Sequence, residues 1–190
     1  MNVARLIESS FNEAAKALTM GTSQRSLARA RERAFTKALI AQFRREFDGE
    51  DHRVFATTQR GNAADFATNQ LLYDIAVCRI GAGKTAERKS EDFHFIAQAL
   101  WQVEIDFSRE WRHALHAINR LNCGGAADKL LITSKLARNQ TQFLETLRAP
   151  SAAVDGAFYL AFVAHPADWD DDADAPQVWR IADGEWKEVK

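Results

Sequence analysis

The chain has 190 residues, 46% of them hydrophobic and 27% charged, a balance that favours a folded globular domain over a disordered chain. The formal net charge of -1 excludes a protein that attracts nucleic acid through a strongly basic overall field, although a local basic groove is still compatible with it. No apolar run is long enough to cross a bilayer, and charged residues lie among the apolar residues of the opening segment, which predicts an amphipathic helix and not a signal peptide. We therefore expect a cytoplasmic protein with no membrane partner.

Two helices are predicted at the start of the chain. Hydrophobic residues at helical spacing predict a first helix within residues 1–22, which Gly21-Thr22-Ser23 ends. A second helix is predicted from about Ser26 to Phe47, with Ser23 or Ser26 as its N-cap. This second helix is rich in arginine. Such a helix could follow a nucleic-acid backbone or present an ordinary solvated face, and the sequence leaves both readings open.

The hydrophobic period then changes to that of β-strands. The elements predicted next are strands at 53–58, 71–80 and 96–107, a helix at 109–122, a strand at 129–133, a helix around 141–147, a strand at 157–163 and a terminal hairpin. Gly81-Ala82-Gly83 is expected to end the second strand, Ser108 to cap the following helix, and Asp183-Gly184 to form the hairpin turn. This order predicts an α/β or α+β sheet covered by helices.

Three carboxylates lie on two of these predicted strands. Asp74 interrupts one apolar run, and Glu104 and Asp106 alternate with bulky apolar residues in the next. Because strand side chains alternate between faces, Glu104 and Asp106 share one face with Gln102. A carboxylate among core residues is destabilising unless it is paired, hydrogen-bonded or bound to metal. The pattern therefore predicts a site for Mg²⁺ or Mn²⁺ of the kind used in phosphate chemistry; the alternative is that Glu104 and Asp106 line a solvent-facing strand.

Hydrolysis of a phosphodiester would use these groups in different roles. Asp74 and Glu104 would hold one or two metal ions, which neutralise charge and supply a hydroxide at neutral pH. Asp106 would add a ligand or accept the proton of the attacking water. The carbonyl of Ile105 could also coordinate, because it lies between the two acids in the sequence.

The order helix, three strands, helix, strand over residues 26–133 resembles the restriction-endonuclease-like superfamily, often called the PD-(D/E)XK nucleases. In that family the first acid lies on the second core strand, matching Asp74, and an acid-x-Lys motif lies on the third, matching Glu104-Ile105-Asp106. The resemblance implies that Glu32 of the first core helix is a further metal ligand, with Glu46 as its rival. It also implies phosphate contacts from the next helix. The candidate residues for contacts with nucleic acid are Arg109, Arg112 and Lys84.

Two positions depart from the family pattern. Tyr73 stands where the motif has Pro, and Asp106 stands where Lys is usual. The Lys is thought to orient or activate the attacking water. Its absence leaves open an alternative: a catalytically inactive nuclease-fold protein that acts as a nucleic-acid- or protein-binding module. A structural or interaction domain whose carboxylates face water is the third possibility.

The sequence thus predicts one domain, 1–190, of class α/β (α+β), with a central mixed sheet flanked by helices around a restriction-endonuclease-like core. Its parts would be the N-terminal helix (1–22), the nuclease-like core (26–133) and a C-terminal helix, strand and hairpin extension (134–190). The expected activity is that of a Mg²⁺- or Mn²⁺-dependent endonuclease acting on DNA. A homodimer or a partner protein, bound through the first helix or the hairpin, is left open.

Overall fold

The computed structural model describes residues 1–17, 23–57, 61–86, 91–136, 138–169 and 173–190. The elements in chain order are α1 (Val3–Lys16), α2 (Gln24–Phe47), β1 (His52–Ala56), α3 (Ala63–Phe66), β2 (Ile75–Lys84), β3 (Asp92–Asp106), α4 (Trp111–Asn122), β4 (Asp128–Ser134), α5 (Gln140–Ala152), β5 (Ala157–Val163), the 3-10 turn η1 (Pro166–Asp168), β6 (Gln177–Ala182) and β7 (Glu185–Val189). Among the described residues, no helix combines the length and apolar composition needed to cross a membrane.

Within the described part of the chain, seven strands form one mixed sheet in the order β1-β2-β3-β4-β5-β6-β7. The first three pair antiparallel, β3 pairs parallel with β4, and β4 pairs parallel with β5. The last two strands again pair antiparallel. The two parallel steps are joined by crossover connections that contain α4 and α5, as parallel pairing requires. The prediction of an α/β fold with a mixed sheet flanked by helices is therefore confirmed.

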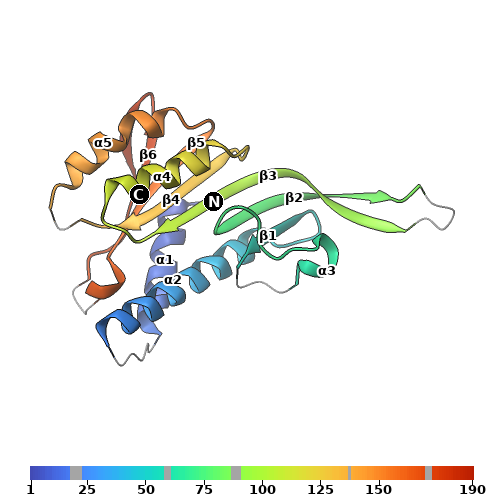
Figure 1. Cartoon of the computed structure of the whole chain (residues 1–190), viewed down its shortest axis with the longest axis horizontal. Helices are drawn as coiled ribbons and strands as arrows, with labels where there is room; N and C mark the ends of the chain where they lie inside the picture. The colour runs from blue at the N-terminus through green and yellow to red at the C-terminus, as the bar shows by residue number, and fades with distance from the viewer. Residues whose placement is uncertain (18–22, 58–60, 87–90, 137, 170–172) are drawn as a thin grey trace.

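Helices cover both faces of the sheet (Figure 1). On one face α1 and α2 contribute to a core in which Phe35 and Leu39 of α2 cluster with Val103 of β3. On the other face α4 and α5 form a second core that contains Leu121 of α4 and Leu131 of β4. Burial of each such side chain stabilises the fold by roughly 1.5–3 kcal/mol. At the end of β3, alternation thus sends Val103 and Ile105 into the core with α2 and leaves Glu104 on the side of α4, where it contacts Arg120.

β2 and β3 continue as a two-stranded arm beyond their neighbours (Figure 1). The prediction that Gly81-Ala82-Gly83 ends the second strand is wrong, and β3 begins at Asp92 instead of near residue 96. Phe95 pairs with Gly81 and Phe93 with Gly83, and each ring occupies the space in which a Cβ would lie. An aromatic ring across from a glycine shields the exposed backbone and offsets the strand-weakening freedom of that glycine.

The start of α4 also differs from the prediction. Ser108 is not its N-cap; Glu110 holds that position without a side-chain cap, and Ser108 Oγ instead accepts the N–H of Glu110 at 3.1 Å. The Ser108 carbonyl accepts the hydroxyl of Thr133 at 3.1 Å. This bond holds the segment against β4, so the helix begins only at Trp111.

Other local predictions are confirmed. Ser23 is the N-cap of α2, and its Oγ accepts the N–H of Ser26 while Ser26 Oγ accepts the N–H of Ser23. The terminal hairpin turns at Asp183 and Gly184, which have φ of 57° and 75°, as a two-residue hairpin turn of this kind requires. The predicted break at Gly21-Thr22 and the end of the first predicted strand at residue 58 lie outside the described residues.

Candidate functional site: a carboxylate cluster at the end of β3

The predicted acids meet where β2 begins and β3 ends. Asp74 immediately precedes β2, whereas the sequence predicted that it would lie within this strand. The antiparallel register pairs Ile75 with Val103, which puts Asp74 beside Glu104. The N–H of Ile105 donates to Oδ2 of Asp74 at 2.8 Å and fixes this carboxylate against β3.

Glu104 is the most enclosed acid of the site. Its side chain is 5% exposed, and its Oε2 forms an ion pair with Nη1 of Arg120 at 3.0 Å. The other oxygen, Oε1, is buried and accepts no hydrogen bond from any described residue. The alternative reading, in which Glu104 faces solvent, is therefore wrong. A buried carboxylate oxygen without a donor is destabilising, and a bound cation is one way to satisfy it.

Burial and neighbouring acids shift the pKa values of the carboxyl groups in this site. Burial, with smaller contributions from the charges of Asp74 and Asp106, raises the pKa of Glu104 to about 7 against the lowering effect of Arg120. Burial also raises the pKa of Asp74, against the lowering effects of the Ile105 N–H and of Arg120. Each effect has the expected sign, because a low dielectric and like charges both disfavour a carboxylate.

Glu32 approaches the site from α2, because Phe35, one turn further along, packs against Phe107 just after β3, with ring centroids 5.6 Å apart. Its pKa is raised by partial burial, then by the charge of Asp106 and, more weakly, of Asp74. We call Glu32, Asp74, Glu104 and Asp106 the carboxylate cluster. Glu46, the predicted alternative to Glu32, lies about 21 Å further along α2, as calculated from the rise of an α-helix. The structure thus favours Glu32 as the acid that α2 adds to the site.

Asp106 is more open to solvent than Glu104. Its side chain is 31% exposed, and its Oδ2 lies 3.6 Å from Nδ1 of His113. The N–H of Ser108 donates to its Oδ1 at 2.8 Å. Glu104 and Asp106 therefore both contact side chains of α4, as their predicted common face requires.

Arg120 is the functional candidate that sequence reasoning missed. Besides Glu104, it binds the carbonyl of Leu72 at 2.5 Å, and its own carbonyl accepts the hydroxyl of Tyr73 at 3.3 Å. It thereby ties the segment before β2 to β3. The available signal was its position on α4, next to the buried residue Leu121, where a long basic side chain can reach over the sheet.

Two of the predicted phosphate-binding residues lie at the start of α4. Arg109 forms an ion pair with Asp168, and its side chain is 47% exposed. The guanidinium of Arg112 lies 5.0 Å from the centre of the Trp111 ring, in a cation–π contact. Both side chains therefore already have partners, although both remain accessible at the surface.

Lys84 lies far from the cluster. It ends β2 on the arm, where its Nζ is 3.6 Å from Asp92. The rise of a strand puts it roughly 30 Å from Asp74. It cannot contact the phosphate that the cluster would bind.

The cluster fits a cation only in part. Among the described residues, no three or more His, Cys, Asp or Glu side chains form a group with the geometry of a metal site. Mg²⁺, however, commonly keeps several waters and binds proteins through one or two carboxylates. Asp74 and the unsatisfied Oε1 of Glu104 could supply those two. Coordination by the Ile105 carbonyl stays a prediction.

Comparison of the chain with protein-family models, with curated proteins and with solved structures finds no match. The resemblance to restriction-endonuclease-like nucleases therefore stays a prediction. The function has to be argued from the site itself.

Proposed function

We propose that the protein is a metal-dependent nuclease that hydrolyses phosphodiester bonds, most simply in DNA. The observation that carries this proposal is the buried Glu104, which has one unsatisfied oxygen and lies beside Asp74 and Asp106. Such an excess of negative charge favours a divalent cation, and Mg²⁺ held by carboxylates is the usual agent of phosphoryl chemistry.

The side chains would divide the work. Asp74 and Glu104 would hold Mg²⁺ or Mn²⁺, with Glu32 as an outer ligand. The ion would supply Lewis-acid stabilisation and a nucleophilic water at neutral pH. Asp106, which is partly exposed at the mouth of the cluster, would accept a proton from the attacking water. Arg109 and Arg112 would bind the phosphate, either in place of their present contacts with Asp168 and the Trp111 ring or in addition to them.

The test combines metal binding with cleavage. Titration calorimetry with Mn²⁺ and Mg²⁺ compares wild type with Asp74→Asn and with Glu8→Gln, an exposed glutamate of α1 that serves as the control. We expect saturable binding in wild type and in Glu8→Gln, and none in Asp74→Asn. At a metal concentration of 100 times Kd, binding should stabilise wild type by about 2.7 kcal/mol. Plasmid cleavage should follow the same pattern.

Absence of metal binding in the wild type would overturn the nuclease proposal. It would favour the second candidate, a catalytically inactive protein that binds nucleic acid or another protein. One observation supports that candidate: Arg120 at 3.0 Å already neutralises part of the Glu104 charge without any metal. In such a protein, DNA binding would persist in EDTA, and no cleavage would occur with any divalent ion.

A further inference from the structure

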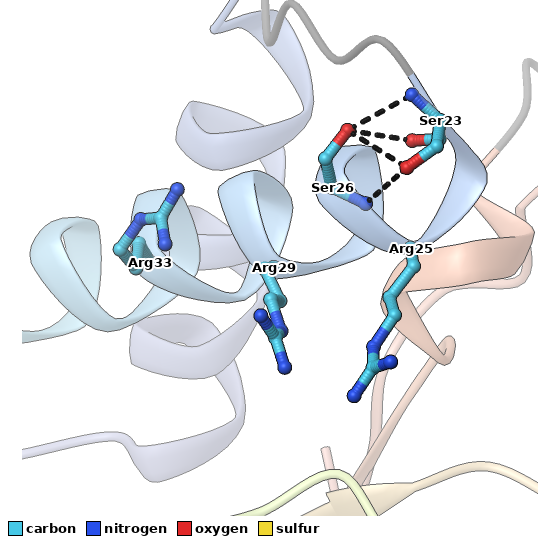
Figure 2. Close-up of a pocket in the computed structure, with 5 residues that line it drawn as sticks. All are labelled: Ser23, Arg25, Ser26, Arg29 and Arg33. Atoms are coloured by element: carbon cyan, nitrogen blue, oxygen red, sulfur yellow. Dashed lines mark hydrogen bonds between the residues drawn. The ribbon is translucent and has the colours of Figure 1, made fainter.

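Three arginines of α2 lie along one side of the helix. Arg25, Arg29 and Arg33 follow one another at intervals of four residues, and all three are exposed. Residues four apart on a helix are neighbours, each about 6 Å further along the axis. They line a surface pocket of about 410 Å³ together with Ser23 and Ser26. Figure 2 shows Arg25 and Arg29 leaving the helix on the same side, whereas the side chain of Arg33 turns the other way. We call these three residues the arginine row.

The arginine row differs from the other arginines of α2 in its partners. Arg31 donates to the carbonyl of Pro166 at 3.0 Å, and Arg44 and Arg45 form ion pairs with Asp48 and Glu13. No member of the row forms a hydrogen bond or an ion pair with any residue that the structure describes. Arg25 and Arg29, which leave the helix on the same side and line the same pocket, form no ion pair with any described residue, so a bound anion would stabilise their charges.

The start of the helix does not by itself account for the pocket. Ser23 and Ser26 bond to each other through a capping box, so Ser23 Oγ already accepts the N–H of Ser26. The N–H groups of Ser23, Ser26 and Leu27 thus already have acceptors, and the arginine side chains supply the charged donors of the pocket. A guanidinium presents a planar fork that matches phosphate oxygens in a bidentate way.

The arginine row ends at the carboxylate cluster. Glu32, the cluster member on α2, lies between Arg29 and Arg33 in the sequence. Arg29 and Glu32 lie one turn apart on the helix. Phe35, a further turn along, packs against the ring of Phe107, which follows Asp106, with 5.6 Å between ring centroids. A polyanion that follows the row would thus arrive at the acids proposed to hold metal.

We propose that Arg25, Arg29 and Arg33 form a track for the phosphate backbone of duplex DNA that leads along α2 to the carboxylate cluster. This inference rests on the proposed nuclease function in one respect only, which is that the bound polyanion is taken to be a nucleic acid. The contacts of the track are with phosphates, so it positions the duplex without reading its sequence.

The test measures the salt dependence of binding to a labelled 20-base-pair duplex in EDTA, so that metal plays no part. Arg25→Gln/Arg29→Gln is compared with Arg44→Gln/Arg45→Gln, which removes the same number of charges from the other end of the same helix. Each phosphate contact contributes about 0.9 to the slope of log K against log salt. The first variant should therefore lose about 1.8 from the slope and up to roughly 60-fold in affinity at 0.1 M salt. The control should keep the wild-type slope, and circular dichroism verifies that both variants fold.

Each other outcome would overturn the track. Equal weakening in both variants would mean that only the net charge matters. Binding of inorganic triphosphate that depends on Arg25 and Arg29, without binding of duplex, would make the pocket a site for small anions. Absence of duplex binding by the wild type at low salt would also refute it. Plasmid cleavage with Mg²⁺ is scored separately, so failure of the nuclease proposal is recognised independently.

Discussion

The buried Glu104 should make the stability of the metal-free protein depend on pH in a defined window. Its pKa rises from an ordinary value of 4.5 to about 7 in the folded state, chiefly through burial. Between these two values the folded state binds more protons than the unfolded state, so stability falls as pH rises. A shift of about 2.5 units corresponds to about 3 kcal/mol. Because the side chain is 5% exposed, solvent screening reduces this figure little.

Glu104→Gln removes this ionisation, so it isolates the effect. Urea unfolding in EDTA at pH 5, 6.5 and 8.5 should show wild type losing about 2.5 kcal/mol relative to the variant across the series, since part of the effect already lies below pH 5. Glu8→Gln, which removes an exposed carboxylate, controls for the change in net charge. A difference between wild type and Glu104→Gln that stays constant with pH would refute the reasoning, because it would mean that Glu104 ionises equally easily in both states.

Three further substitutions test the packing around the site. Gly124→Ala should lower the free energy of unfolding by about 1–3 kcal/mol, because the added Cβ would overlap the side chains of Gln102 and Tyr73. Gly125→Ala is the control: its Cβ would have no atom within 4 Å, so the free energy of unfolding should change by less than about 0.5 kcal/mol. Equal effects of the two substitutions in urea unfolding would contradict this prediction. Arg120→Gln should destabilise the protein by about 1–3 kcal/mol at pH 8, and less at pH 5 where Glu104 is protonated, since it leaves a buried charge unpaired. Lys129→Met should leave the melting temperature unchanged or raise it, because burial lowers the pKa of this fully enclosed lysine and opposes its charge. A drop of several degrees would show that the hydrogen bond from Lys129 Nζ to the Asp155 carbonyl stabilises the fold by more than burial of the charge destabilises it.

Local sequence signals predicted most of the secondary structure. The strand at 157–163 was predicted with the bounds that the structure has, and Asp183-Gly184 forms the expected turn. Periodicity and turn chemistry are properties of neighbouring residues, so they can be read without knowledge of the fold. The arm escaped prediction because Gly81 and Gly83 are supported by aromatic rings of the paired strand that lie ten or more residues away in the sequence.

The candidate site was likewise predicted only in part from the sequence. The predicted alternation placed Glu104 and Asp106 on a common face, and both reach α4 in the structure. Arg120 could not be assigned in advance, because its contacts with Glu104 and Leu72 depend on how α4 crosses the sheet. Lys84, close in sequence to the second strand, lies on an arm that carries it away from the acids.

The sequence by itself determined which residues can bind a metal ion or a phosphate and which face of each strand or helix they occupy, because the periods of strands and helices are local properties. Only the tertiary structure decided which of these residues meet. The β2–β3 register brought Asp74 beside Glu104, and the packing of α2 brought Glu32 to Asp106. Burial then moved the pKa of Glu104 to about 7, a change that depends on how much water the surrounding elements exclude and that no stretch of sequence carries alone.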